Sequence, residues 1–436
     1  NKNSQGTAVI FPIIELHKGK KLAHRCPEAR IAESVCLVKA IGLKPLYTET
    51  INLNSPKSST LIGTGKLDAL TKVIDLYKIE IVVIDSHLNA IQQRNLEKKL
   101  QVKVIDRTAL ILEIFATRAR TKEGRLQVEL AALTYQRSRL VRSWTHLERQ
   151  RGGFGFLGGP GETQIEADKR QIDVRIKKIK QSLSQVVKTR KLHRSVRQRI
   201  PYPIIALVGY TNAGKSTLFN QLTGASVKVA DQLFATLDPT MRALTLPCGQ
   251  KCILSDTVGF VSELPHDLIS AFRATLEEVV TADIIVHVRD ISHIETKNQK
   301  LDVMQVLADL GLENKTGNNQ IIEVWNKIDC ITESTKNSLR SRTYKDSLHR
   351  KIMVSATNGE GIRALIDEIS LSLQKNKKII TACVPIINGA IQALIHQKGQ
   401  VLETKSNDEF TWLTVRLQDS DIARISTQKD VIIYHH

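Results

Sequence analysis

The chain has 436 residues, and its 63 Lys and Arg outnumber its 44 Asp and Glu, so the formal net charge at neutral pH is +19. Hydrophobic residues make up 42% and charged residues 25% of the chain, which excludes a wholly disordered protein and supplies apolar material for roughly two to four domains. No apolar run approaches the roughly 18 residues of a bilayer-spanning helix, and no charged-then-apolar leader is present. We therefore expect a cytoplasmic protein without a membrane span.

The six cysteines give no metal signature, because none forms the C-x-x-C pairs of a zinc site. Cys248 and Cys252 are spaced C-x-x-x-C around Gly249. We interpret this segment as a turn between two strands, with reduced thiols.

The excess charge is concentrated in residues 118–200, which carry 21 basic and seven acidic side chains, a net charge of +14. Such a local charge repels itself unless an anion meets it, and nucleic acid is the usual anionic partner. Aromatic residues make up only 4% of the chain, which argues against a surface that stacks single-stranded bases. We therefore favour recognition of structured RNA through its backbone and shape over the alternative, a pair of solvated helices.

Residues 1–117 alternate short apolar runs with helical patterns, which predicts a small parallel sheet covered by helices. Within this region, Gly63-Thr64-Gly65-Lys66 opens a predicted helix. A glycine-rich turn at a helix N-terminus can hold a phosphate, but the full phosphate-loop spacing is missing, so a nucleotide site and a plain turn with a cap are both open. The predicted strands are 7–14, 44–51, 80–85 and 102–106, and the predicted helices are 28–41, 66–78, 89–100 and 107–117.

Residues 118–200 contain two long helical patterns, over 122–149 and over 164–199. Apolar residues recur in both at an average spacing near 3.5, which predicts an antiparallel helical hairpin about 42 Å long. The first stripe consists of Leu126, Leu130, Leu133, Leu140, Trp144 and Leu147, and the second of Ile165, Ile172, Ile176, Ile179, Leu183 and Val186.

The segment that joins the two helices, residues 149–164, contains six glycines together with Phe154, Phe156 and Leu157. Exposed apolar side chains at a tip cost solubility, and glycine lets a backbone approach a partner closely. We interpret the segment as a probe that becomes ordered when it is inserted into a partner, and a flexible tip is the alternative.

Residues 201–373 carry a phosphate loop. The apolar run 204–208 leads directly into Gly209-Tyr210-Thr211-Asn212-Ala213-Gly214-Lys215-Ser216, which is G-x-x-x-x-G-K-S in its strand–loop–helix setting. The glycines let backbone N–H groups surround the phosphates. Lys215 is expected to reach the β- and γ-phosphates, and the Ser216 hydroxyl to bind Mg²⁺.

Three further motifs follow in the order of a guanine-nucleotide site. Asp256-Thr257-Val258-Gly259 ends a strand, so Asp256 can hold Mg²⁺ through water and the Gly259 N–H can meet the γ-phosphate. Asn326-Lys327-Ile328-Asp329 ends another strand, and the Asp329 carboxylate can accept two N–H groups that guanine offers and adenine does not. Ser355-Ala356 ends a third strand, and its backbone can contact guanine from the other side.

A mobile threonine between the phosphate loop and D-x-x-G is expected to sense the γ-phosphate. Thr236 and Thr240, both in Phe234-Ala235-Thr236-Leu237-Asp238-Pro239-Thr240, are candidates, and their spacing does not choose between them.

Five segments are more specific than these shared GTPase motifs: GTGK at 63–66, LQVELAAL at 126–133, GGPGETQ at 158–164, FATLDPT at 234–240 and DTVGF at 256–260. With them, nearly the whole chain resembles the translation-factor-related GTPases, and specifically the HflX family. The resemblance implies that Thr236 is the Mg²⁺ ligand and that the N-terminal domain binds ATP. It also implies binding to the large (50S) ribosomal subunit and its 23S rRNA, with the glycine-rich loop near the peptidyl-transferase centre, and separation of stalled or idle 70S ribosomes.

Two residues bear on the rate of hydrolysis. Many GTPases place a glutamine directly after D-x-x-G to orient water, whereas this chain has Phe260, so we expect slow hydrolysis until a partner completes the site. The amide oxygen of Asn212 offers a hypothetical ligand for K⁺ beside the phosphates, and a loop-stabilising role is the alternative.

The patterns together predict an α/β fold. A P-loop GTPase domain (201–373) is preceded by a small parallel α/β domain (1–117) and a long antiparallel helical hairpin (118–200). A small C-terminal α+β domain (374–436) follows, with a helix near 388–397.

We expect a monomer that hydrolyses GTP with Mg²⁺ and binds the ribosome. Lys215, Thr236 and Gly259 take the catalytic roles, and Ser216, Thr236 and Asp256 form the metal site. The predicted nucleotide-binding residues are Gly209, Tyr210, Thr211, Asn212, Ala213, Gly214, Lys215, Ser216, Thr217, Phe234, Ala235, Thr236, Leu237, Asp238, Asp256, Thr257, Val258, Gly259, Asn326, Lys327, Ile328, Asp329, Ser355, Ala356 and Thr357.

Two other functions are compatible with parts of the sequence. An RNA-binding factor for ribosome assembly, gated by GTP, would share every motif. A metabolic P-loop enzyme that acts on a small molecule is disfavoured by the guanine-reading Asp329 and by the basic hairpin.

Overall fold

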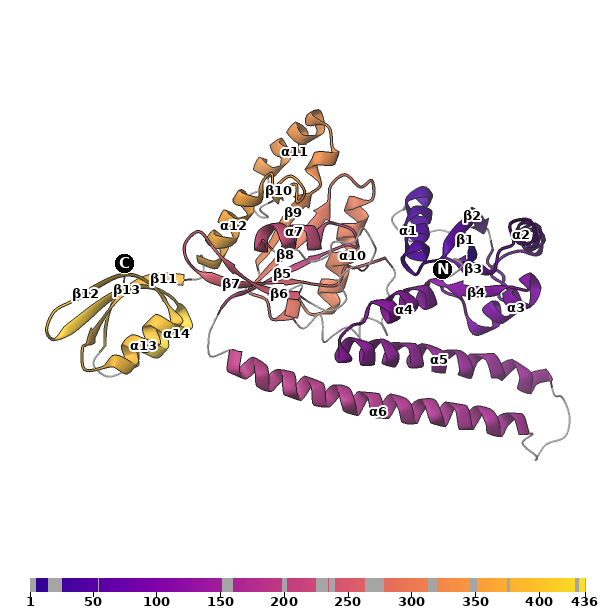
Figure 1. Cartoon of the computed structure of the whole chain (residues 1–436), viewed down its shortest axis with the longest axis horizontal. Helices are drawn as coiled ribbons and strands as arrows, with labels where there is room; N and C mark the ends of the chain where they lie inside the picture. Colours follow the sequence, from indigo (N-terminus) through magenta and orange to yellow (C-terminus); the bar gives the residue numbers. More distant parts are fainter. Residues whose placement is uncertain are drawn as a thin grey trace.

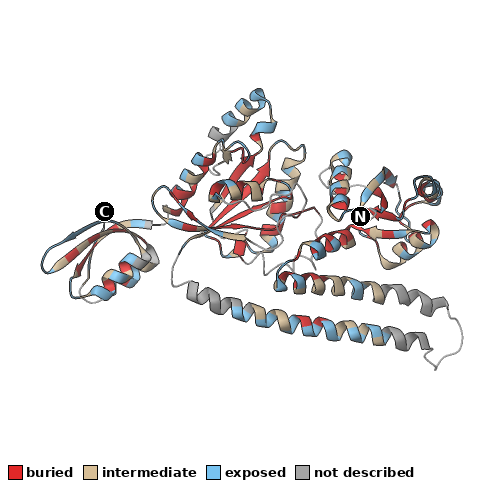
Figure 2. Cartoon of the chain, in the orientation of Figure 1, coloured by how far each residue is buried: buried red, intermediate tan, exposed pale blue. Residues whose placement is uncertain are grey.

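The computed structural model describes residues 5–14, 26–53, 55–150, 160–197, 202–224, 234, 240–262, 278–312, 320–345, 351–374, 377–427 and 431–435. For the hairpin ends, 141–150, 160–165 and 190–197, it describes the backbone alone. Four units follow one another along the chain, and the predicted α/β architecture is confirmed (Figure 1). Burial is concentrated in the sheets of the N-terminal and GTPase units, whereas the hairpin helices are mostly half-buried or exposed (Figure 2).

The N-terminal unit is a parallel four-stranded sheet in the order β2-β1-β3-β4, with helices on both faces. Alternate residues of β1 serve the two faces: Ala8 packs with the residues of α2 and α3, and Val9 with those of α1 and α4. The elements are β1 (Gly6–Ile14), α1 (Pro27–Ala40), β2 (Lys44–Leu53), α2 (Thr64–Tyr77), β3 (Ile81–Ile84), α3 (Ala90–Leu100), β4 (Lys103–Asp106) and α4 (Arg107–Arg118).

The glycine-rich turn of this unit lies at the start of α2, with Gly63 as its N-cap. The Lys66 ammonium is 3.3 Å from a carboxylate oxygen of Glu49. Among the described residues, Lys66 therefore forms an ion pair with Glu49 of the same chain.

The helical hairpin consists of α5 (Lys122–Gln150) and α6 (Pro160–Arg197), which lie side by side (Figure 1). Two ion pairs join the helices: Arg175 Nε is 2.8 Å from Glu129 Oε1, and Arg137 Nε is 2.7 Å from Asp173 Oδ1. The connection is shorter than the expected 149–164, because α6 already begins at Pro160, a residue that suits a first helical turn since it lacks an N–H. The predicted tip residues Phe154, Phe156 and Leu157 lie outside the described residues.

The GTPase unit is a six-stranded sheet in the order β10-β9-β8-β5-β7-β6, in which β6 alone runs antiparallel to its described neighbour. The cysteine-containing segment is the expected turn between β6 and β7, with Gly249 at φ 77°. Its elements are β5 (Ile204–Gly209), α7 (Lys215–Thr223), β6 (Thr240–Thr245), β7 (Lys251–Asp256), β8 (Ile284–Asp290), α10 (Thr296–Asp309), β9 (Gln320–Asn326), the 3₁₀ helix Ile328–Cys330, α11 (Glu333–Lys345), β10 (Lys351–Met353) and α12 (Ile362–Gln374).

The C-terminal unit has the element order βαββαβ, with an antiparallel sheet in the order β12-β13-β11-β14. This is the ferredoxin-like arrangement, and its two helices bury Ile391, Ile395, Ile422 and Ile425 against one face of the sheet (Figure 1). The elements are β11 (Lys377–Pro385), α13 (Gly389–Lys398), β12 (Gln400–Ser406), β13 (Phe410–Gln418), α14 (Asp419–Ser426) and β14 (Ile432–His435).

One apolar core cluster continues from the N-terminal unit into the GTPase unit. It contains Leu110 and Phe115 of α4, Val128 of α5, and Val258 and Phe260 of the D-x-x-G segment. The helices α4 and α5 therefore pack in the same core as the segment expected to meet the γ-phosphate.

Candidate functional site

The phosphate loop connects β5 to α7, and two glycines are required by its neighbours. Gly209 has φ 155°, and a Cβ there would lie 2.2 Å from the Val288 carbonyl oxygen. Gly214 has φ 88°, and a Cβ there would lie 2.2 Å from Asn326 Nδ2. The turn is therefore packed too tightly against β8 and β9 for any side chain at these positions.

Lys215 is buried at the first position of α7. Its Nζ donates to the carbonyl oxygens of Gly209, at 3.2 Å, and Tyr210, at 2.8 Å. Burial lowers the pKa of this lysine to about 8, and the nearby Asp256 carboxylate opposes that shift. Phosphate oxygens close to this lysine would stabilise its ammonium form and raise its pKa again.

Ser216 and Asp256 form an oxygen pair suited to Mg²⁺. The Ser216 Oγ donates to Asp256 Oδ2 at 2.7 Å, and Asp256 is almost fully buried. Both groups are oxygen donors of the kind that Mg²⁺ prefers, so the Ser216 hydroxyl would bind the ion directly and Asp256 would hold it through water. The third predicted ligand, Thr236, lies outside the described residues.

The D-x-x-G segment lies directly against the phosphate loop. The Thr211 N–H donates to the Phe260 carbonyl oxygen at 2.7 Å, and the Phe260 N–H donates to the Gly209 carbonyl oxygen at 3.1 Å. A Cβ at Gly259 would lie 3.0 Å from Lys215 Nζ. The Phe260 ring itself is buried in the core, so its side chain cannot orient a water molecule.

Asn326 and Asp329 have different roles in the guanine-reading motif. Asn326 is buried, donates through Nδ2 to the Ala213 carbonyl oxygen at 2.8 Å and accepts the Ala356 N–H at 3.0 Å, so it ties the phosphate loop to the Ser355-Ala356 turn. Asp329 is exposed, and the Ser355 hydroxyl donates to its Oδ1 at 2.6 Å, which lowers the pKa of the carboxyl below its usual range. Asp329 is therefore an ionised hydrogen-bond acceptor that a nucleotide base can reach.

Several of the other residues predicted to lie around the guanine base and the switch make contacts within the chain. The Lys327 ammonium is 2.8 Å from Asp290 Oδ2, and Lys327 has φ 62°. Thr357 Oγ1 is 2.9 Å from Ser355 Oγ, and Thr257 Oγ1 donates to the Leu207 carbonyl oxygen at 2.6 Å. Val258 and Ile328 have buried apolar side chains. Asn212 has a left-handed backbone with φ 58°, and Thr217 lies in the first turn of α7.

Phe234 is the one predicted switch residue before Thr240 that the structure describes. Its ring is buried and meets the Phe115 ring of α4 edge-on, with the centroids 4.7 Å apart. Its side chain therefore packs between the units. Ala235, Thr236, Leu237 and Asp238 lie outside the described residues, and their roles stay predictions.

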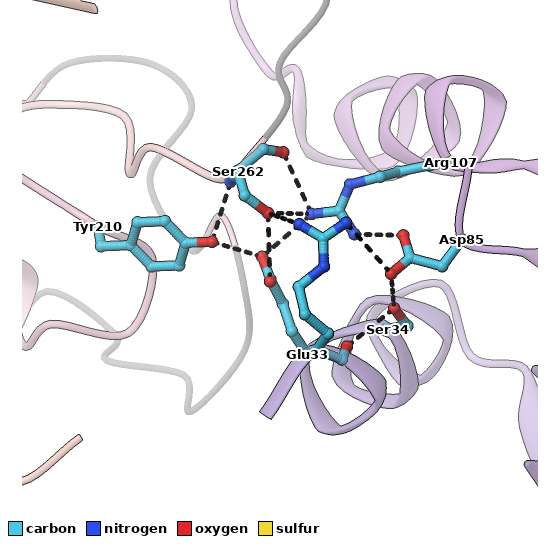
Figure 3. Close-up of polar contacts among 7 residues, drawn as sticks. Glu33, Ser34, Asp85, Arg107, Tyr210 and Ser262 are labelled. Carbon is cyan, nitrogen blue, oxygen red and sulfur yellow. Dashed lines mark hydrogen bonds and ion pairs between the residues drawn. The ribbon is translucent and has the colours of Figure 1, made fainter. Parts of the chain in front are cut away.

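A buried polar cluster lies between the N-terminal and GTPase units, and the sequence patterns did not predict it (Figure 3). It joins Glu33, Asp85 and Arg107 to Tyr210 of the phosphate loop and Ser262 after D-x-x-G. The sequence did contain an indication of a polar site there. Asp85 and Arg107 directly follow two neighbouring parallel strands, and α/β sheets hold ligands at the edge where such strands end. The partner that occupies this edge was not readable from the sequence.

One doubly wound domain contains a strand, a phosphate loop, a D-x-x-G turn and the exposed carboxylate of the predicted guanine-reading motif. These features define a P-loop GTPase. Family models for the GTP-binding GTPase N-terminal region, the GTP-binding GTPase middle region and the 50S ribosome-binding GTPase match residues 28–116, 118–197 and 204–327. A relative called GTPase HflX from Magnetococcus marinus is 48% identical, over 90% of this chain and 89% of the relative. A second relative of that name, from Escherichia coli, is 39% identical, over 92% of this chain and 93% of the relative. The chain belongs to the HflX family, and it is a GTP hydrolase.

A solved structure gives a more distant likeness. A GTP-binding protein from Sulfolobus solfataricus in complex with GDP is 23% identical, with a TM-score of 0.44 over 84% of this chain and 98% of that one. Separately, none of the helices in the described ranges combines the length and the apolar character needed to cross a membrane.

Proposed function

We propose that this GTPase binds the large (50S) ribosomal subunit and uses GTP to split stalled or idle 70S ribosomes. The observation that carries the proposal is the basic helical hairpin, whose helix α5 lies along the N-terminal unit (Figure 1). The GTPase unit of the same chain matches the 50S ribosome-binding GTPase model. Its net charge of +14 suits the phosphates of 23S rRNA.

The hydrolysis chemistry requires positioning and charge stabilisation rather than a nucleophilic side chain. Lys215 and the backbone N–H groups of the loop hold the β- and γ-phosphates, and the Gly259 N–H meets the γ-phosphate. Ser216 and Asp256, with Thr236, would hold Mg²⁺, which supplies positive charge to the phosphates when it is bound. Because the Phe260 ring is buried, the group that orients the water comes from elsewhere in the assembled complex.

The cycle then has two states. GTP orders the switch segment through Thr236 and favours a hairpin position that inserts between the ribosomal subunits. Hydrolysis loosens the switch and releases the protein.

Sucrose-gradient profiles of 70S particles incubated with the protein and GTP test this function. Conversion of 70S into separate subunits with GTP but not with GDP is expected. Comigration only with immature precursors, and intact 70S peaks, would instead favour the assembly factor.

Asn212 carries a second, narrower proposal, that a K⁺ ion assists hydrolysis. Asn212 and Thr211 line a cavity between the phosphate loop and α1, and the carboxylates of Glu33 and Asp290 contribute oxygen atoms to the same lining. Hydrolysis in matched KCl and NaCl buffers tests the proposal. Faster turnover in K⁺ supports it, and equal rates remove it.

A further inference from the structure

Ser262 lies three residues after Gly259 and is completely buried in the N-terminal unit. Its hydroxyl accepts hydrogen bonds from Arg30 Nη1 at 2.9 Å and from Arg107 Nη2 at 2.8 Å, and Arg107 Nη2 also donates to its carbonyl oxygen at 3.2 Å (Figure 3). A serine whose hydroxyl is held by two guanidinium groups, and whose carbonyl oxygen is held by one of them, has little positional freedom. The end of the D-x-x-G segment is therefore fixed by the N-terminal unit.

The phosphate loop joins the same cluster through Tyr210. The Tyr210 hydroxyl accepts the Ser262 N–H at 2.9 Å and donates to Glu33 Oε1 at 2.7 Å (Figure 3). Glu33 is in turn 3.2 Å from Arg107 Nη2. One glutamate of α1 thus connects the phosphate loop to the arginine that holds the switch segment.

The charges of the cluster are balanced inside it. Asp85 accepts hydrogen bonds from Arg107 Nη1, at 2.5 Å, and from the Ser34 hydroxyl, at 2.6 Å. Burial alone would raise the pKa of Asp85, but Arg107 and Arg30 hold it below its usual range. Breaking one buried pair leaves an uncompensated charge, so the cluster resists the loss of any single partner.

The residue before Arg107 holds the hairpin. Asp106 is completely buried, and its Oδ1 accepts the Tyr135 hydroxyl of α5 at 2.6 Å, while its Oδ2 accepts Arg139 Nη2 at 2.7 Å. Arg139 also donates to the Leu88 carbonyl oxygen at 3.2 Å. Two consecutive residues at the start of α4 therefore hold the hairpin on one side and the switch segment on the other.

We propose that Asp106 and Arg107 are positioning residues that link the nucleotide state at Gly259 to the hairpin through the N-terminal unit. The sequence of contacts runs from Gly259 along the backbone to Ser262, to Arg107, to Asp106 and to Tyr135. A γ-phosphate that binds Gly259 shifts Ser262, and the rigid start of α4 transmits the shift to α5. This inference rests on the proposed function and names the residues that execute its coupling step.

Hydrogen exchange in the full-length protein tests the link without a ribosome. The readout is the difference in amide exchange of residues 126–140 between the complex with a non-hydrolysable GTP analogue and the complex with GDP. Ser262→Ala removes the hydroxyl that both arginines hold, and Tyr135→Phe removes the hydroxyl that Asp106 holds. Both substitutions are small, and in each variant every buried charged side chain keeps at least one of its polar partners.

The unmodified protein is expected to show slower exchange of residues 126–140 in one nucleotide state, and each variant to lose at least half of that difference. Ser184→Ala at an exposed position of α6 and Tyr77→Phe on α2 are matched controls that keep the full difference. A merely structural role would change exchange equally in both nucleotide states.

Equal exchange of the unmodified protein in the two states, or an undiminished difference in both variants, overturns the link. The gradient experiment is independent of this outcome. A protein that splits 70S particles with GTP but fails the exchange test loses the link alone, whereas a protein that passes the exchange test and splits nothing loses the proposed function alone.

Discussion

At the scale of single residues, Lys215 combines burial with a lowered pKa of about 8. Because its folded pKa lies below its ordinary value of 10.5, the charged form is disfavoured in the folded protein, and unliganded stability rises as the pH increases from about 8 towards 10.5. Phosphate oxygens reverse this preference, since they stabilise the ammonium.

We therefore expect GDP affinity to fall as the pH rises above about 8, by up to about tenfold per pH unit, with proton uptake on binding. Titration calorimetry in two buffers with different ionisation enthalpies measures both quantities. An affinity that stays constant between about pH 7.5 and about pH 9.5 would contradict this assignment of the pKa.

Asp329 is the residue that we expect to separate guanine from adenine. Asp329→Asn exchanges one carboxylate acceptor for a donor, so one guanine N–H loses its partner and meets another N–H. We expect GTP affinity to fall by about 3 kcal/mol, roughly a hundredfold, and affinity for xanthosine triphosphate, which carries an acceptor at that position, to rise.

Competition binding against a fluorescent guanine nucleotide measures both changes. Ser355→Ala serves as the comparison, because it removes the hydroxyl that orients Asp329 but keeps the carboxylate, and its effect should be smaller. Unchanged nucleotide preference in the Asp329 variant would show that another group reads the base.

At the scale of elements, the hairpin supplies charge and a fixed position. The exposed lysines Lys177, Lys178 and Lys180 lie on α6 beside the buried seam residues Ile176 and Ile179. Their side chains are free to meet phosphates without disturbing the contact between the two helices.

Replacing all three lysines by Gln should weaken 50S binding and reduce the slope of log affinity against log salt by about two to three, since each lost phosphate contact removes about one. The same substitution of Lys39, Lys72 and Lys98, exposed on the N-terminal helices, is the matched control. Salt-dependent cosedimentation provides the measurement. If the two triple variants behave alike, the hairpin is not the RNA-binding element.

The boundaries of the elements were largely predictable from the sequence, because short apolar strands and amphipathic helices alternate with clear turn residues. The start of α6 was not. Glycine and proline at 158–161 indicate a loop by propensity, yet Pro160 begins the helix, since a first turn needs no N–H from that residue.

At the scale of the whole molecule, we expect the position of Phe260 to limit the rate of hydrolysis. Its ring is buried in the core shared by the N-terminal and GTPase units, and no described side chain takes the place of the usual glutamine directly after D-x-x-G. The isolated protein should therefore hydrolyse GTP far more slowly than about 1 s⁻¹, and ribosomal subunits should accelerate it. Phosphate release with and without 50S particles measures the two rates, and rapid turnover by the isolated protein would refute the need for a partner.

The nucleotide site could be predicted from the sequence because its parts are local: each motif lies within a few residues of a strand end, and its expected chemistry follows from those residues. The sequence likewise determined the charge of the hairpin and the order of the four units. The cluster around Ser262 was decided only by the tertiary structure, since it brings together residues separated by as many as 232 positions. No periodicity or spacing records such contacts, because they depend on how two independently patterned sheets meet.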